Sequence, residues 1–171
     1  MTRLLPTSRD PVIDYRETFW FPAAPTQVWD AIERFDDFPT WWGWLRTFDV
    51  DRGGLVEGNR LRGTVQPPLP YRFRVDVRLD RCERPRVVKA HVEGDLEGEA
   101  QLSLERAGVG TCATVDWSLA MAHGPIRAAA LFAYPLVRWG HDRVVETTVE
   151  GFRRHALPDH PELATRVLLH R

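Results

Sequence analysis

The chain contains almost no lysine and almost no net charge. Lys89 is the only lysine among 23 basic residues, and the formal net charge is −1. A chain without a basic excess has no overall field that attracts nucleic acid or an anionic membrane. We therefore expect no nucleic-acid partner. The preference for arginine is ascribed to codon usage in a GC-rich genome, and no phosphate site is inferred from it.

Cysteine and long apolar runs are scarce as well. Cys82 and Cys112 fall in separate predicted strands and form no CxxC pair, so reduced thiols and a cytoplasmic location are expected. The longest apolar stretch, near residues 128–137, is too short to span a bilayer and contains Pro135. The N-terminus has no apolar run of signal-peptide length. These features predict a soluble protein without an integral membrane segment.

Motifs for metals and cofactors are also missing. The six histidines show no HxxxH or HExxH spacing, so we expect no metal. The glycines at 53–54 and 108–110 fit hairpin turns, because neither group lies between a strand and a helix start, where a phosphate-binding loop would lie. Glu97 and Glu99 share the polar face of a predicted strand. We expect no cofactor.

What the chain does contain is a series of segments in which apolar and polar residues alternate. This period of two is typical of an antiparallel sheet with one dry face. Short turns join the segments, so we expect a meander of about seven strands. The predicted strands cover residues 13–21, 44–51, 59–66, 71–79, 86–93, 96–106 and 111–121.

Helical spacing occurs after the first strand and again near the C-terminus. Pro25 opens a predicted helix that reaches Arg34, and a second short helix or turn follows around residues 38–42. From Pro125 to Leu157, apolar residues recur at steps of three and four, which predicts a long helix.

The long helix should be kinked or split at Pro135, which removes a backbone hydrogen bond. One face of it should pack on the sheet. That face carries Ala130, Tyr134, Val137, His141, Val144, Val145, Thr148 and Phe152. The pattern therefore predicts a single α+β domain at residues 12–157, in which a curved antiparallel sheet wraps the C-terminal helix. A loose N-terminal arm at 1–11 and a tail at 158–171 complete the chain.

Four segments carry a resemblance to a known family. They are PTQVWDAIERFDDFPTWW, GNRLRGTVQPPLPYRFRVDV, GDLEGEAQLSLERAGVGTCATVDWSL and LVRWGHDRVVETTVEGFRRHAL. In order and spacing, over about residues 13–157, they resemble the SRPBCC superfamily of START-like and polyketide cyclase/dehydrase-like proteins. The resemblance implies the helix-grip fold with a hydrophobic cavity between sheet and helix. Members include lipid carriers, metabolite binders, cyclases and co-chaperones, so no catalytic motif can be carried over.

Three polar residues interrupt the predicted inward face of the helix: Tyr134, His141 and Thr148. Buried polar groups need partners. His141 and Tyr134 are therefore candidate acid/base or ligand-contacting groups, and the alternative for His141 is a core histidine bonded to a sheet residue or a water. His91, in a predicted strand, should face outward. The expected ligand-binding residues are Phe73, Val75, Leu102, Val115, Trp117, Tyr134, Val137, His141, Val145 and Thr148.

Three functional hypotheses remain open from the sequence. The first is binding or transport of a small hydrophobic ligand, such as a lipid, an isoprenoid or a polyketide-like molecule. The second is a cyclase- or dehydratase-like enzyme that uses His141 and Tyr134 on a polyketide-type substrate. The third is an interaction module that uses the aromatic residues at 38–48, which alternatively form a small core. An open apolar cavity would favour ligand binding, and convergence of His141 and Tyr134 in the cavity would favour the enzyme. A filled interior would favour the interaction module.

Overall fold

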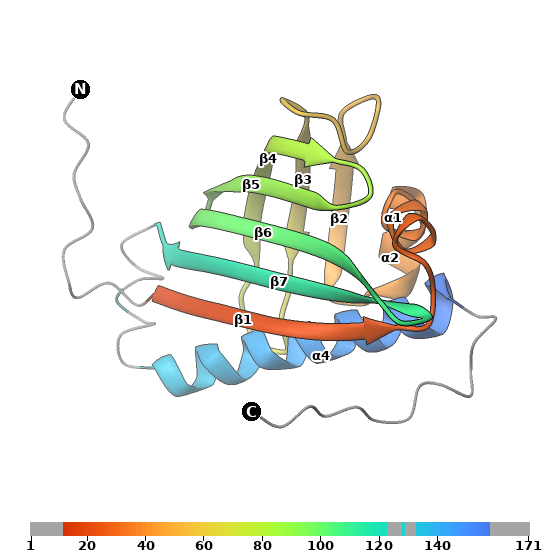
Figure 1. Ribbon diagram of the computed structural model, residues 1–171. Helices are drawn as coiled ribbons and strands as arrows, with labels where there is room; N and C mark the ends of the chain where they lie inside the picture. Colours follow the sequence, from red (N-terminus) through yellow and green to blue (C-terminus); the bar gives the residue numbers. More distant parts are fainter. Residues whose placement is uncertain (1–11, 123–127, 129–132, 158–171) are drawn as a thin grey trace.

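The computed structural model describes residues 12–122, 128 and 133–157 (Figure 1). The predicted arm at 1–11, the tail at 158–171 and the stripe residue Ala130 lie outside these described residues, so the domain boundaries stay a prediction.

Seven antiparallel strands form one sheet in the order β1-β7-β6-β5-β4-β3-β2. The strands from β2 to β7 follow one another as a meander, and β1 pairs with β7 along its whole length. The predicted α+β class with a seven-stranded sheet is confirmed. The strands are β1 (Val12–Phe21), β2 (Leu45–Val50), β3 (Arg60–Val65), β4 (Phe73–Glu83), β5 (Val87–Gly94), β6 (Leu96–Ala107) and β7 (Gly110–Met121).

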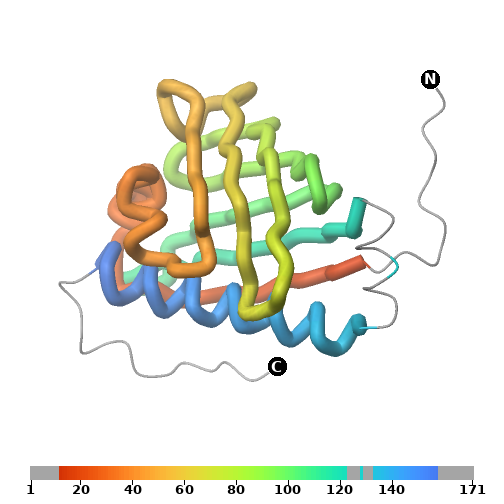
Figure 2. Tube along the Cα trace, turned by 180° about the vertical axis from the view of Figure 1, so that it is seen from behind, coloured from red at the N-terminus to blue at the C-terminus, as the bar shows by residue number. Residues whose placement is uncertain are grey.

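The sheet is curved, and its concave side holds the C-terminal helix (Figure 2). Two strands contain irregularities in their pairing, between Leu45 and Thr47 in β2 and between Leu79 and Arg81 in β4. Such bulges bend a strand and increase its twist. Bending in β2 and β4 helps that half of the sheet to close over the helix.

The short helices α1 (Pro25–Ile32) and α2 (Phe38–Trp41) lie together at one end of the sheet, with a 3-10 turn at Phe35–Asp37 between them (Figure 1). Pro25 begins α1, and the Gln27 side chain accepts a hydrogen bond from the Ala24 N–H at 2.9 Å. Proline suits the first turn because its missing N–H would have no helical partner there. The apolar side of α1 is fixed by Trp29, which is 1% exposed.

Helix α4 (Tyr134–Ala156) has 23 residues and therefore spans roughly 35 Å. Pro135 lies in its first turn rather than in its interior. Ala128 is helical and Ala133 is not, so the helical pattern is interrupted directly before α4, in keeping with the predicted kink or split at Pro135. Within the described part of the chain, no helix is both long enough and apolar enough to cross a membrane.

Two glycines of α4 let other parts of the chain approach the helix closely. A Cβ atom at Gly140 would lie 2.7 Å from Leu69 Cδ1, and one at Gly151 would lie 2.8 Å from the Trp41 carbonyl oxygen. Both separations are too short for a real side chain. Gly140 thus admits the loop between β3 and β4, and Gly151 admits the end of α2. These contacts bring Leu69 and Trp42 to the rim of the space described next.

Candidate ligand-binding cavity

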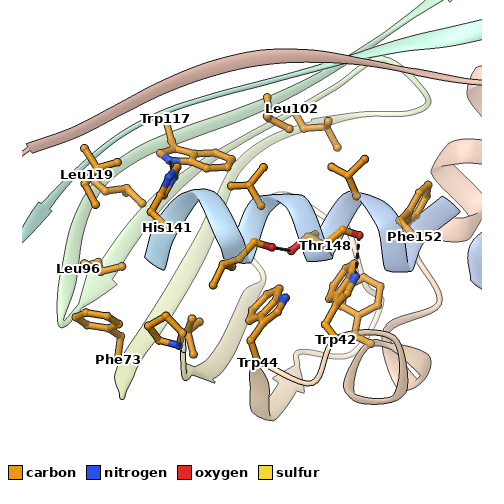
Figure 3. A pocket seen from close by; sticks show the side chains of 18 of the residues that line it. Trp42, Trp44, Phe73, Leu96, Leu102, Trp117, Leu119, His141, Thr148 and Phe152 are labelled. Atoms are coloured by element: carbon orange, nitrogen blue, oxygen red, sulfur yellow. Dashed lines mark hydrogen bonds between the residues drawn. The ribbon is translucent and has the colours of Figure 1, made fainter. Parts of the chain in front are cut away.

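A cavity of about 440 Å³ lies between α4 and the concave face of the sheet (Figure 3). This volume falls in the range of about 300–1,000 Å³ that is usual for small-molecule sites. Its wall is built from alternate residues of the strands and from one side of α4. Strand β7 contributes all five residues that its alternation predicts to point inward: Ala113, Val115, Trp117, Leu119 and Met121.

Eight of the ten residues expected at a ligand site line this cavity: Phe73, Leu102, Val115, Trp117, Val137, His141, Val145 and Thr148. Their shared position follows from the period of two in the strands and the steps of three and four in the helix. Val75 does not line it. Val75 lies two residues beyond Phe73 in β4 and borders a separate hollow beside Phe48 and Gly63.

Tyr134 is the second expected residue that the cavity lacks. Its side chain lies in the first turn of α4 and is 37% exposed, and its hydroxyl donates to the Val12 carbonyl at 3.4 Å. Because α4 begins at this residue, Tyr134 occupies the end of the helix, beyond the cavity wall. His141 and Tyr134 therefore do not converge on a common space, which is the arrangement that would favour the enzyme hypothesis.

His141 does line the cavity, but both of its ring nitrogens have partners. Trp117 Nε1 donates to His141 Nε2 at 3.1 Å, and His141 Nδ1 lies 2.9 Å from Asp142 Oδ1. An indole nitrogen can only donate, so Nε2 must be the unprotonated nitrogen and Nδ1 must carry the hydrogen. We infer the neutral Nδ1–H tautomer, which corresponds to the alternative of a core histidine bonded to a sheet residue.

Tyr15 completes an aromatic group at this end of the cavity. Its ring stacks on Trp117 at 4.7 Å between centroids and meets His141 edge-on at 5.0 Å. Burial, followed by the negative charges of Glu17 and Asp142, raises the pKa of Tyr15 from 10.0 to about 12. The group Tyr15, Trp117, His141 and Asp142 is called the histidine cluster below.

A second polar side chain of the cavity wall is Trp44, which is separate from the histidine cluster. Its indole faces α4 (Figure 3). Its ring stacks on Trp42 at 5.6 Å, and Trp42 Nε1 donates to the Thr148 carbonyl at 3.0 Å. Trp44 Nε1, in contrast, is buried and has no hydrogen-bond partner among the described residues. Trp29 Nε1 is also buried without one, but it does not line the cavity.

The sequence pointed to the aromatic residues at 38–48, with Trp41, Trp42 and Trp44 near the cavity mouth, as a patch or a small core, and it did not distinguish Trp44 from the other two tryptophans. Phe38 is 7% exposed and packs on Trp41, Trp42 and Phe48. The segment is thus largely a packed wall. The sequence does show a cluster of three tryptophans just before a predicted strand, which indicates an aromatic wall. It does not show which indole N–H groups find hydrogen-bond partners, because tertiary contacts decide that.

Other candidate groups lie outside the cavity. His91 is half-buried in β5 and pairs in register with Arg78 and Glu99, while Val88, Ala90 and Val92 on the other face of the strand are buried. Among the described residues, no three His, Cys, Asp or Glu side chains are grouped in a way that could hold a metal ion.

A curved antiparallel sheet gripping a long helix around an apolar cavity defines the class of helix-grip proteins. Residues 13–157 match the family described as polyketide cyclase / dehydrase and lipid transport, and the chain belongs to this family. The predicted SRPBCC-type relationship is thereby confirmed. No curated protein gives a significant match.

Solved structures share the fold at low sequence identity. The protein TTHA0849 from Thermus thermophilus is 17% identical with a TM-score of 0.69, over 86% of this chain and 99% of that chain. A START superfamily protein from Mycobacterium smegmatis is 14% identical with a TM-score of 0.62, over 84% and 97%. The Zhui aromatase/cyclase from Streptomyces sp. R1128 is 14% identical with a TM-score of 0.62, over 86% and 93%. At these identities the similarity concerns the fold alone.

Proposed function

We propose that this protein binds a small hydrophobic molecule, of lipid, isoprenoid or polyketide-like size, in the cavity between α4 and the sheet. The observation that carries the proposal is an unfilled space of about 440 Å³ whose wall is almost entirely apolar side chain. Apolar surface that a core leaves unpacked loses dispersion contacts, and an apolar ligand restores them. Carriage of such a ligand between sites would follow from the same property.

The contacts of the polar wall residues favour binding over acid/base catalysis. His141 Nε2 already accepts from Trp117, and Nδ1 already faces Asp142, so neither nitrogen is free to take a proton from a substrate without breaking the cluster. Tyr134 lies outside the cavity wall. No observation on the described residues supports a cyclase or dehydratase that uses this pair.

The packing of the aromatic residues at 38–48 also favours ligand binding over the hypothesis of a protein-interaction module. Their rings pack on one another, and Phe38, Trp42 and Trp44 line the cavity. A segment that serves as a wall presents little free apolar surface to a protein partner.

The proposal is tested by filling the cavity. Val145 lies on the cavity side of α4, and Val145→Trp would place an indole in the open space. Affinity for a neutral naphthylamine fluorophore should fall by at least about tenfold, whereas overpacking a filled core would cost about 1–3 kcal/mol of stability. The matched control is Val109→Trp, at a position 82% exposed in the turn between β6 and β7.

Two results would contradict the proposal. One is unchanged fluorophore binding by Val145→Trp, which would place the ligand elsewhere. The other is a stability loss of the size expected for a filled core. Native mass spectrometry of the purified protein, followed by extraction, would then identify any molecule that co-purifies with it.

A further inference from the structure

A second hollow adjoins the cavity where the start of β2, the β3–β4 loop and α4 meet. Four residues line both spaces, so the hollow and the cavity share one wall: Trp44, Pro67, Leu69 and Val144. The other residues of the hollow, called the rim groove below, are Gly43, Arg46, Gln66, Pro68, Pro70, Arg143 and Thr147. The groove is therefore polar where the cavity is apolar.

The charge of the rim groove has one sign. Arg46 and Arg143 line it, and none of its lining residues is acidic. Arg143 forms an ion pair with Glu146 at 2.5 Å, but Glu146 lies outside the groove lining. The groove thus presents guanidinium groups without a carboxylate between them.

A third arginine reinforces this charge. Arg46 Nε and Arg72 Nε both donate to Gln66 Oε1, at 3.0 and 3.1 Å. Neither arginine has an ion pair with a carboxylate in the part of the chain that the structure describes. Two like charges that meet at one neutral oxygen repel each other, and an anion between them would remove that repulsion. Each guanidinium retains further N–H groups that can donate.

Two other arginines of the sheet, Arg60 and Arg62, differ from Arg46 and Arg72 in having carboxylate partners. Arg60 contacts Asp76 at 3.0 Å and Glu93 at 3.1 Å, and Arg62 contacts Asp51 at 3.0 Å. These two guanidinium groups are therefore neutralised by carboxylates of neighbouring parts of the sheet, whereas Arg46 and Arg72 share the neutral oxygen of Gln66.

Trp44 adds a neutral donor at the boundary between the two spaces. Its buried Nε1–H has no partner among the described residues, and a buried donor left unpaired costs about 1–3 kcal/mol. This nitrogen is enclosed by protein, so an oxygen atom of a ligand that passes from the cavity into the groove would satisfy it only after the indole ring turns.

We propose that the rim groove binds the acidic head group, carboxylate or phosphate, of an amphipathic ligand whose apolar part occupies the cavity. Arg46 and Arg143 hold the anion, and Arg72 supports Arg46 through Gln66. Trp44, once its ring turns, donates to an oxygen at the junction of head and apolar part. Arginine matches carboxylates and phosphates through its planar fork of N–H groups. This inference rests on the proposed function and specifies its ligand class.

The test compares three ligands with the same alkyl chain: a fatty acid, its methyl ester and an alkyl phosphate. Each displaces the neutral naphthylamine fluorophore from the protein at neutral pH. The acid or the phosphate should bind about three- to tenfold more tightly than the ester, because each exposed charge pair contributes modestly. Added salt should weaken the acidic ligands alone.

Arginine variants test whether the preference for the acid over the ester arises in the rim groove. Arg46→Gln and Arg143→Gln should each reduce the ratio of acid to ester affinity toward one while leaving ester binding unchanged. The control Arg52→Gln removes an exposed arginine just past the opposite end of β2, and it should keep the wild-type ratio. A preference for carboxylate over phosphate, or the reverse, identifies the head group.

Three outcomes separate the inference from the proposed function. Equal binding of acid and ester by the wild type overturns the inference and leaves the proposed function standing. A preference for the acid that survives in both Arg46→Gln and Arg143→Gln overturns the placement in the rim groove. If neither the fluorophore nor any ligand binds, the proposed function itself fails.

Discussion

Two of the polar places on the cavity wall differ in how their hydrogen bonds are satisfied. In the histidine cluster, Trp117, His141 and Asp142 bond one another within the protein. At Trp44, the indole N–H is buried without a described partner, beside a groove that carries Arg46 and Arg143. The polar groups of the histidine cluster thus already have partners within the protein, whereas Trp44 and the two arginines have N–H groups and positive charge that a ligand could use.

This difference changes where a ligand should be sought. A histidine in an inward stripe is the conspicuous polar residue in the sequence, yet a network whose members are satisfied serves to hold the wall in one arrangement. A buried donor without a partner is uncommon in native proteins and calls for an explanation. We therefore infer a structural role for His141. Trp29 Nε1 is buried without a described partner as well, so the ligand-contacting role proposed for Trp44 rests on its place in the wall that the cavity and the groove share.

The largest expected effect comes from breaking the histidine cluster. Trp117→Phe keeps an aromatic ring against Tyr15 but removes the donor to His141 Nε2. A buried acceptor left without its donor should lower the free energy of unfolding by about 1–3 kcal/mol. Denaturant unfolding followed by circular dichroism measures this loss. A variant as stable as the wild type would show that the cluster contributes nothing.

A smaller effect should appear at alkaline pH through Tyr15. Its pKa is raised to about 12 in the folded protein, mainly by burial, so between pH 10 and 12 the unfolded chain releases this proton first. Stability is therefore complete below pH 10 and declines as pH rises toward 12. Allowing for solvent screening, the loss is about 1 kcal/mol.

Tyr15→Phe provides the comparison for this titration. Its unfolding free energy should decline less over the same pH interval, because the residue has no proton to release. The difference in ultraviolet absorbance between wild type and variant reports the ionisation of Tyr15 itself. Ionisation near pH 10 would contradict the proposed burial against Trp117 and His141.

The smallest effect on stability is expected at Trp44. Trp44→Phe makes the same reduction in ring size as Trp117→Phe, but the N–H that it removes has no described partner. Its cost should be about 1 kcal/mol or less and should stay below that of Trp117→Phe in the same unfolding measurement. Equal losses for the two variants would remove the distinction between the two places.

The period of two allowed most of the fold and the wall to be predicted. Alternation alone placed Val115 and Trp117 on the inner face of β7, and helical spacing placed Val137 and Val145 on the inner face of α4. Such patterns report which face a side chain occupies. They do not report where along a face the cavity begins and ends, which is why Val75 and Tyr134 were assigned to it.

The hydrogen-bond partners of the polar wall residues could not be predicted from the sequence for a different reason. The partner of His141 is 24 residues away on another element, and the two arginines that meet at Gln66 come from either side of it in the chain. Tertiary structure brings such groups together: the pairing of β2 with β3 places Arg46 beside Gln66, and the packing of α4 on the sheet places His141 beside Trp117.

The central claim is that a ligand contacts Trp44 and leaves the histidine cluster intact. Nuclear magnetic resonance of the indole N–H groups tests it most directly, with signals assigned by Trp44→Phe and Trp117→Phe and with the fatty acid as ligand. We expect a saturable downfield shift of the Trp44 Nε1–H signal, and a Trp117 signal that still reports its bond to His141. A Trp117 signal that loses this bond while the Trp44 signal stays in place would contradict the claim.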